Sequence, residues 1–331
     1  MDLAAFPCHD NTAKRALRED GFYRLSGLVD TEKWRSAVSC PSGTVNYQQM
    51  RSYINESFQQ LDARLGWESV LTKYRVSAGC SFDASNATDA SALHRDVQQH
   101  SNTVNIPVFT LIVYLDHADL KLIPGSHRHH RMSLVRALAA RSTVLSFKPG
   151  DALLFHASLL HGGVFRTLKR RTIVQCFDIY PTRQLAAQFS PRIMQIWCPQ
   201  LETETKRGVL VSKLSYTPVV APIVQYLAYM IAAGGNGHGR IALPDNVDAL
   251  SCEAWRPRLE PEAEKDGQFH RGNLYVAADA EFINDADPVT NARMRDCIYR
   301  QIYMGTALRV GLLVAILVVL LVVMVRSRSR P

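Results

Sequence analysis

Two histidines and one aspartate in this chain have the types and the order that would hold a metal ion. His94 and Asp96 form a His-x-Asp pair, and His161 follows far downstream, just before two glycines. Two imidazoles and one carboxylate are the ligand set that holds non-haem iron(II) while leaving coordination positions open. A co-substrate and dioxygen can bind at open positions, so these residues predict an oxygenase site.

The spacing of the pair fits a single metal ion. Residues i and i+2 of an extended strand point to the same face, so His94 and Asp96 can reach one ion while Arg95 points away. His156 competes with His161 for the third ligand position. We favour His161, because the glycines after it remove side-chain bulk and allow a close approach. His156 is then a residue of the barrel wall or of the surroundings of the site.

A basic residue beyond the second histidine would bind the far carboxylate of an oxo-acid co-substrate through a charge-assisted, bidentate pair. Arg170 is the candidate, and Thr172 follows two residues later, where an extended strand would place its hydroxyl on the same face. Arg171 would point to the opposite face. A one-residue change of register would exchange the two arginines, so the choice between them stays open.

The turn at Pro124-Gly125-Ser126 leads into His127, Arg128 and further basic residues. One interpretation is a turn with surface histidines. The other interpretation places His127 or Arg128 at the mouth of the active site, where either side chain could meet an acidic group of the substrate.

The elements that must position these residues are mostly short strands separated by turns that contain proline or glycine. Strand-like stretches occupy 71–77, 107–115, 142–147, 151–156 and 172–180. Helices are predicted over 11–19 and 47–65, and a helical insertion over 131–140. Many short strands with few long helices predict a mainly β fold with flanking helices, either a sandwich or a jelly roll.

These motifs resemble, in their order and spacing, the phytanoyl-CoA dioxygenase-like branch of the Fe(II)/2-oxoglutarate-dependent oxygenases. The similarity spans roughly residues 10–195 and is carried by His94-x-Asp96, Pro124-Gly125-Ser126-His127, Pro149-Gly150-Asp151, Phe155-His156, Leu160-His161-Gly162 and Arg170-x-Thr172. The resemblance implies a double-stranded β-helix (jelly roll, cupin-like). It also implies that His94, Asp96 and His161 hold Fe(II), and that 2-oxoglutarate chelates this iron and pairs with Arg170.

In that family, oxidative decarboxylation of 2-oxoglutarate gives succinate, carbon dioxide and an oxidant that hydroxylates an unactivated C–H bond. The halide-binding relatives lack the carboxylate ligand, so the presence of Asp96 argues against them. The chain departs from the family pattern in two places. Gly163 stands where some members carry a hydroxyl residue that helps to bind 2-oxoglutarate, and the usual extra Lys or Arg upstream of His94 is not identified.

The C-terminal segment predicts a membrane anchor. Every residue from 310 to 325 is apolar, with Arg309 before this run and a basic tail over 326–331 after it. The run is about 24 Å long as a helix, and extension back to Met304 gives a full span in which Arg309 reaches the headgroups. We therefore predict a single-pass transmembrane helix over 304–325.

The predicted location follows from the position of this anchor. Residues 1–20 lack a continuous apolar core, which argues against a secretory signal, so the catalytic part is expected in the cytosol. Seven widely spaced cysteines without a C-x-x-C pair favour a reducing compartment. Outer mitochondrial, peroxisomal, endoplasmic-reticulum and viral envelope membranes all stay open as the site of anchoring.

The length of the chain allows a large domain and an extension, and its charge bears on the possible partners. Of the 331 residues, we predict an oxygenase-like domain over 1–205 and an extension of unassigned role over 206–303 before the anchor, with a buried or interfacial helix at 219–233. The net charge of +8 is scattered, and the absence of a basic tract interleaved with aromatic residues argues against nucleic acid as a partner.

The sequence thus predicts a membrane-anchored Fe(II)/2-oxoglutarate-dependent dioxygenase that hydroxylates a lipid, an acyl thioester or another small molecule. One alternative is a catalytically inactive jelly roll that serves as a scaffold or envelope membrane protein. Another is a cupin-type enzyme that uses a different metal or needs no oxo-acid. The oligomeric state is not predicted.

Overall fold

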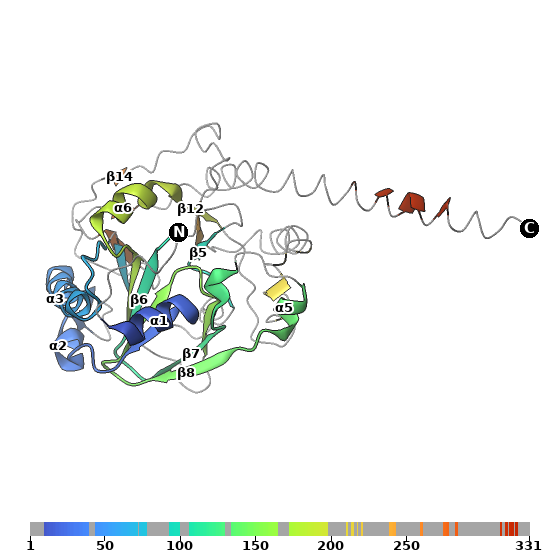
Figure 1. The fold of residues 1–331 in the computed structure, drawn as a ribbon. Coiled ribbons are helices and arrows are strands. Elements are labelled where there is room, and N and C mark those ends of the chain that lie inside the picture. Colours follow the sequence, from blue (N-terminus) through green and yellow to red (C-terminus); the bar gives the residue numbers. More distant parts are fainter. Residues whose placement is uncertain are drawn as a thin grey trace, which may run out of the picture.

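Two antiparallel sheets packed face to face form the centre of the protein in this computed structural model (Figure 1). The structure describes residues 10–39, 44–71, 73–77, 93–99, 106–129, 134–164 and 172–197, together with short stretches beyond residue 209.

The larger sheet has six strands in the order β1-β9-β6-β11-β4-β15, all antiparallel to their neighbours. Its strands are β1 (Phe22–Leu25), β4 (Lys73–Ser77), β6 (Phe109–Tyr114), β9 (Ala152–His156), β11 (Ile173–Ile179) and β15 (Leu274–Ala277). The smaller sheet has the order β10-β7-β8. Its strands are β7 (Ala118–Leu122), β8 (Thr143–Phe147) and β10 (His161–Val164).

The chain crosses repeatedly between these sheets. The steps from β6 to β7, from β8 to β9 and from β10 to β11 each change sheet. An antiparallel bridge between His94 and His161 adds the segment before β5 (Val97–Gln98) beside β10. The smaller layer therefore consists of β8, β7, β10 and the segment that contains His94. It faces β4, β11, β6 and β9 of the larger sheet, which is the arrangement of a jelly roll. The prediction of a mainly β fold with flanking helices is confirmed.

Apolar side chains fill the space between the sheets because they alternate along each strand. The larger sheet contributes Ile112, Tyr114, Leu153, Phe155 and Ile173, and the smaller sheet contributes Leu120, Leu122 and Phe147. The opposite face of the larger sheet, which includes Leu111, Val113, Val174 and Cys176, belongs to a second cluster that it shares with helices. Burial raises the pKa of the Cys176 thiol, so this cysteine is a core residue.

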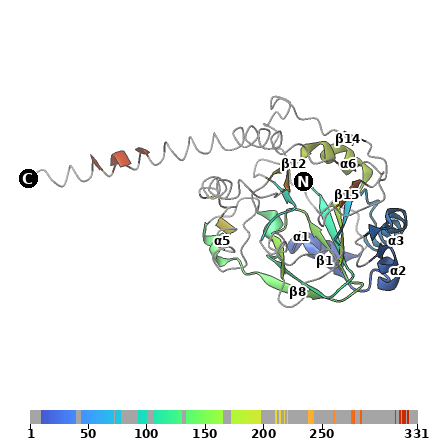
Figure 2. The same ribbon diagram turned by 180° about the vertical axis from the view of Figure 1, so that it is seen from behind.

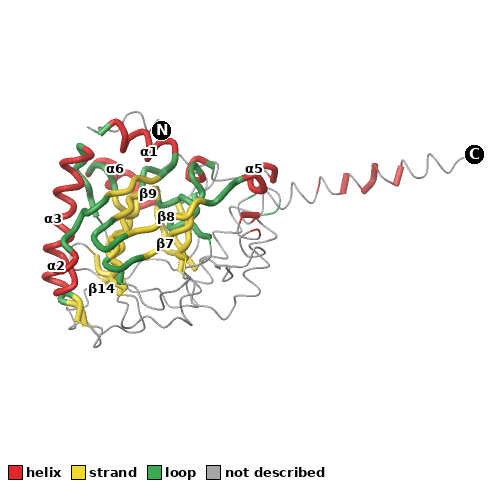
Figure 3. Tube along the Cα trace, turned by 90° about the horizontal axis from the view of Figure 1, so that it is seen from below, coloured by secondary structure: helices red, strands yellow, loops and turns green. Residues whose placement is uncertain are grey.

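The helices of this second cluster are α1 (Asn11–Glu19), α2 (Thr31–Ser36) and α3 (Tyr47–Leu65). Each begins at a side chain that accepts hydrogen bonds from the first turn, namely Asp10, Asp30 and Asn46. The longest helix ends at Gly66, whose φ of 69° suits a left-handed cap. Figure 3 shows these helices at the margin of the strands.

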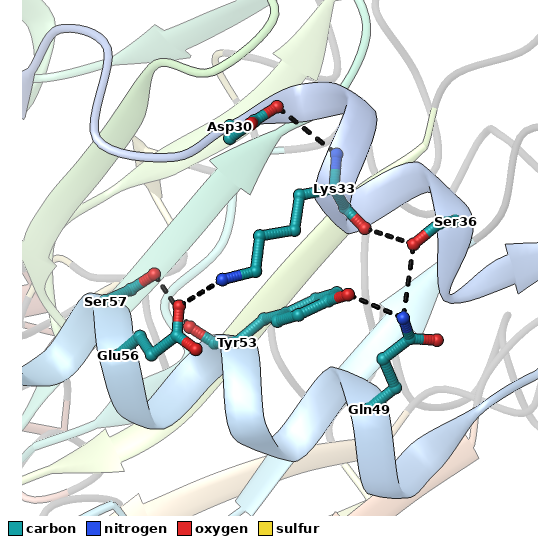
Figure 4. Close-up of polar contacts among 7 residues, drawn as sticks. All are labelled: Asp30, Lys33, Ser36, Gln49, Tyr53, Glu56 and Ser57. Atoms are coloured by element: carbon teal, nitrogen blue, oxygen red, sulfur yellow. Dashed lines mark hydrogen bonds and ion pairs between the residues drawn. The ribbon is translucent and has the colours of Figure 1, made fainter.

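Helices α2 and α3 lie side by side on the outer face of the larger sheet in both ribbon views (Figures 1 and 2). Trp34 stacks on Tyr53 at their interface, with 6.4 Å between ring centroids. Around this apolar contact, Lys33 pairs with Glu56, and Gln49 donates to the hydroxyl oxygens of Tyr53 and Ser36 (Figure 4). The pair of helices is thus joined by packing and by surface polar contacts.

The other helices described between residues 10 and 197 are short. They are η3 (Ser126–Arg128), α5 (Leu134–Ala139), α6 (Arg183–Phe189) and η4 (Ser190–Arg192). Helix α6 packs with Tyr180 and Val97 in a third apolar cluster. Two small hairpin-like pairs join β2 (Val38–Ser39) to β3 (Thr44–Val45) and β14 (Leu259–Glu260) to β16 (Phe282–Ile283).

Strands from the C-terminal extension pair with strands from the first 205 residues. Strand β13 (His238–Ala242) lies between β12 (Ile193–Trp197) and β5, parallel to β5 with Arg240 opposite Val97. Strand β15 pairs with β4 at the edge of the larger sheet. The extension therefore contributes directly to the sheets around the predicted site. The predicted helix at 219–233 lies outside the described residues except for position 220.

The predicted anchor over 304–325 also lies largely outside the described residues. Those described within it are helical, namely 312, 315, 316, 318–320, 322 and 323. Among the parts of the chain that the structure describes, no helix has both the length and the apolar character needed to span a membrane.

Candidate metal centre

His94, Asp96 and His161 lie together, and each offers one ligand atom within 4.8 Å of the others. Oδ1 of Asp96 is 3.7 Å from Nε2 of His94 and 3.7 Å from Nε2 of His161. Ligand atoms that share a metal ion at about 2.1 Å lie roughly 3–4 Å apart. A single ion between these three atoms therefore needs only small side-chain movements.

Backbone pairing explains why the two histidines meet. The N–H of His94 donates to the carbonyl of His161 at 2.8 Å, and the N–H of His161 donates back at 3.0 Å. Such a doubly bonded antiparallel pair fixes the two Cα atoms as direct neighbours. The imidazole rings consequently lie 4.4 Å apart between centroids.

His161 is oriented and neutral, as a metal ligand must be. Its Nδ1 lies 3.0 Å from the carbonyl oxygen of Leu159. Because a carbonyl only accepts, Nδ1 carries the hydrogen, and the lone pair of Nε2 faces Asp96. Burial, with a smaller contribution from His94, lowers the pKa of His161 to about 4 despite the opposing effect of Asp96. The ring is packed against Phe155 at 4.5 Å between centroids.

Asp96 is held by a residue that the sequence did not reveal as part of the site. The hydroxyl of Thr110, on β6, donates to Oδ2 of Asp96 at 2.7 Å. This bond leaves Oδ1 directed at both histidines. Thr110 is fully buried within the otherwise apolar start of β6. A hydroxyl residue in an apolar central strand was the available signal, since a buried hydroxyl requires a partner.

The cluster is enclosed but not sealed. The side chains of His161 and Asp96 are 3% and 7% exposed, whereas that of His94 is 20% exposed. His94 is therefore the member of the cluster that solvent contacts most. The rest of the surroundings is the apolar space between the sheets.

His156 lies apart from this cluster. It is fully buried, its Nδ1 is 2.8 Å from the hydroxyl oxygen of Ser158, and its ring packs against those of Phe109 and His127. Phe109 belongs to the helix-facing side of the larger sheet, whereas the predicted ligands lie at the other side. Of the two candidates for the third ligand position, the structure brings His161 to His94 and Asp96.

His127 is fully buried, so the interpretation of this residue as a surface histidine is wrong, and the placement of His127 or Arg128 at the active-site mouth stays a prediction. Its Nε2 lies 3.2 Å from the carbonyl oxygen of Arg18, and burial lowers its pKa to about 4. Its ring fits over Gly21, where an added Cβ would approach Nδ1 to 2.2 Å. The neighbouring Arg128 is exposed.

The residues predicted to bind the co-substrate are only partly described. Arg170 and Arg171 lie outside the described residues. Thr172 is buried, and its backbone N–H donates to Oδ2 of Asp116 at 2.6 Å. Gly163 lies in β10 opposite Leu120. Binding of an oxo-acid at these positions stays a prediction.

No protein-family model and no curated protein matches the sequence. Among solved structures, the chain is similar to the non-heme alpha ketoglutarate dependent epimerase SnoN from nogalamycin biosynthesis (15% identity, TM-score 0.36, 51% of this chain and 81% of the other). It is also similar to EctD from S. alaskensis with 2-oxoglutarate and 5-hydroxyectoine (17% identity, TM-score 0.35, 54% of this chain and 78% of the other). A third similar structure is HygX from Streptomyces hygroscopicus with nickel and 2-oxoglutarate bound (12% identity, TM-score 0.34, 52% of this chain and 87% of the other). Likenesses this distant establish neither a family nor an activity.

Proposed function

We propose that this protein is an Fe(II)/2-oxoglutarate-dependent oxygenase. The observation that carries the proposal is the convergence of His94, Asp96 and His161 on one point inside a jelly roll. Two imidazoles and one carboxylate occupy one face of an Fe(II) ion and leave the other positions open for dioxygen and an oxo-acid. The neutral His161 fits this ion, and so does the carboxylate of Asp96, whose Oδ1 lies 3.7 Å from Nε2 of each histidine.

The chain's own residues have separable tasks in this proposal. Bound iron supplies the site at which dioxygen and the oxo-acid react. His94, Asp96 and His161 hold the ion, and Thr110 fixes the carboxylate in one orientation. Phe155 and the other apolar side chains between the sheets exclude water from the inner side of the site.

The co-substrate is proposed to be 2-oxoglutarate. Its far carboxylate would pair with the guanidinium of Arg170 or Arg171, assisted by the hydroxyl of Thr172, because a planar guanidinium matches a carboxylate with two parallel hydrogen bonds. The motif pattern supports a reaction of the phytanoyl-CoA dioxygenase-like kind. We infer hydroxylation of an unactivated C–H bond in a lipid, an acyl thioester or another small molecule.

We further propose that residues 304–325 anchor the protein in a membrane, with the catalytic part in the cytosol. The support is the uninterrupted apolar run from 310 to 325. The large apolar side chains described within it are between 44% and 65% exposed, so the folded part of the chain does not bury them. Exposed apolar residues in such a run are stabilised by hydrocarbon. When membranes are washed at alkaline pH, the full chain should stay in the membrane fraction. A chain that ends at residue 303 should be released.

The test of the enzymatic proposal uses the full chain, purified without oxygen in detergent. We expect one Fe(II) per chain and, on admission of oxygen, production of succinate that requires both iron and 2-oxoglutarate. His94→Ala and Asp96→Ala should each abolish iron binding and succinate production. His117→Ala is the matched control, because this histidine is exposed and lies outside the cluster.

The alternatives give different results in the same assay. A folded chain that binds no iron and forms no succinate would favour the inactive scaffold. Iron binding with turnover that is independent of 2-oxoglutarate would favour a cupin-type enzyme.

A further inference from the structure

Arg95 stands between two of the predicted ligands, and its side chain is buried. The residue is 6% exposed. A buried guanidinium is costly unless acceptors surround it, because the charge loses its hydration. The charge of Arg95 therefore needs acceptors close to it.

The guanidinium binds backbone carbonyls from two separate loops. Nη1 donates to the carbonyl of Ser158, in the loop from β9 to β10. Nη2 donates to the carbonyls of Ser126 at 3.2 Å and of His129 at 2.9 Å, in the turn around η3. Arg95 thus joins the segment that carries His94 and Asp96 to the loop that leads into His161 and to the turn beside that loop.

The two loops are also bonded to each other next to the metal ligand. The N–H of Leu160 donates to the hydroxyl of Ser126 at 2.8 Å, and the N–H of Ile123 donates to the carbonyl of Leu160 at 2.9 Å. One residue further on, His161 exchanges backbone hydrogen bonds with His94. The carbonyls that Arg95 binds therefore lie next to the backbone pair of His94 and His161, which sets the distance between these two ligands.

We infer that Arg95 is a positioning residue for the metal centre, which holds the segment from His94 to Asp96 and the loop that leads into His161 at ligand spacing before a metal binds. The inference rests on the proposed function. Its physical basis is that ordering ligands in advance removes an entropic cost from binding. The fixed fork of a guanidinium can serve three carbonyls at once, whereas an ammonium or an amide serves fewer of them in this geometry.

The test is a titration of the full chain with Co(II), an oxygen-stable probe whose visible spectrum reports its ligands. Arg95→Gln should weaken Co(II) binding by about 10- to 100-fold, as loss of groups that orient metal ligands typically does. Arg95→Lys, which keeps the charge and some of the donors, should give an intermediate affinity. Both variants should keep the near-ultraviolet circular dichroism of the folded chain.

The matched control is Arg24→Gln. Arg24 lies on the edge strand β1, and its Nη2 bonds Oδ2 of Asp151 at 2.6 Å, so it also joins distant parts of the chain through a guanidinium. This variant should lower the melting temperature and leave the affinity for Co(II) unchanged. A loss of affinity confined to the Arg95 variants is the result that supports a role in ligand placement.

Other results would overturn the inference in distinguishable ways. If the folded Arg95→Gln or Arg95→Lys chain binds Co(II) as the unmodified chain does, the positioning role is wrong while the metal site stands. If neither variant folds, Arg95 serves the whole fold rather than the ligands, and the inference is also wrong. If the unmodified chain does not bind Co(II), the proposed function fails together with it.

Discussion

Thr110 donates its hydroxyl hydrogen to Oδ2 of Asp96 at 2.7 Å, and this bond connects the larger sheet to the segment from His94 to Asp96, which a bridge joins to β10 of the smaller sheet. Without it, the carboxylate could rotate and present either oxygen to the histidines. The bond therefore couples the relative position of the two sheets to the orientation of one metal ligand.

Replacing Thr110 by valine tests this coupling, because valine keeps the shape and removes the donor. We expect weaker Fe(II) or Co(II) binding, by about tenfold. The free energy of unfolding should fall by only about 1 kcal/mol, the usual net value of a hydrogen bond. Isothermal titration and thermal melts measure the two effects separately. Thr110→Ser, which keeps the hydroxyl, should bind metal nearly normally, and equal affinity in both variants would contradict the prediction.

Alanine substitutions at Arg170 and Arg171 should separate the two candidates for the co-substrate carboxylate. Loss of a bidentate pair to a carboxylate should raise the KM for 2-oxoglutarate at least tenfold, because the buried end of the co-substrate loses its partner. Iron binding should be unchanged in both variants. Only one of the two should show the effect, because the backbone predicted here is extended, and adjacent side chains of an extended backbone point to opposite faces. Normal KM values in both would show that neither arginine binds the co-substrate.

Gly21→Ala should destabilise the protein more than Gly27→Ala. Both glycines have positive φ, 84° and 58°, so each alanine costs about 1 kcal/mol of backbone strain. At Gly21 the new Cβ would also approach Nδ1 of the buried His127 to 2.2 Å, whereas at Gly27 nothing lies within 4 Å. Overpacking of this kind adds about 1–3 kcal/mol. Equal losses in chemical denaturation would show that His127 can move aside.

Because His127 is buried, we expect the stability of the protein to fall at mildly acidic pH. Burial lowers its pKa from 6.5 to about 4, so the unfolded chain binds a proton at this residue before the folded chain does. Stability should therefore be complete above pH 6.5 and should fall as the pH decreases toward 4, by roughly 2–4 kcal/mol for this residue. In His127→Gln the free energy of unfolding should vary less over this range. An unchanged pH profile would mean that the imidazole takes up its proton in the folded state.

Truncation after residue 205 should damage the fold, whereas truncation after 303 should not. The shorter chain lacks β13 and β15, which pair with β12, β5 and β4. Unpaired strand edges expose backbone donors and acceptors and promote aggregation. We expect the 1–303 chain to be monodisperse and to bind metal, and the 1–205 chain to have a lower melting temperature and weaker metal binding. Equal behaviour of the two chains would show that the extension is dispensable.

The local elements could be predicted from sequence where caps and periodicity agree. The helices predicted at 11–19 and 47–65 coincide with α1 and α3, which begin after Asp10 and Asn46. The predicted strands overlap β4, β6, β8, β9 and β11. The short helix α2 was missed, although Asp30 is a good N-cap, because six residues contain too little apolar periodicity. Strand β10 was missed because its glycines resemble a turn.

The contacts of the site depend on non-local pairing and could not be predicted in the same way. The motif indicated His94, Asp96 and His161 because their residue types and spacing are informative on their own. The roles of Thr110 and Arg95 depend on the register of strands far apart in sequence, which a single sequence does not fix. The burial of His127 has the same origin, since it depends on how Gly21 passes beneath the turn.

The parallel pairing of β13 with β5 also affects the order in which the protein can be assembled during synthesis. Strand β13 ends about 80 residues after His161, and a ribosome adds roughly 5–20 residues per second. All three ligands are therefore synthesised several seconds before the strand that pairs with β5 is complete. We expect the nascent chain to acquire its metal only late in translation or after release.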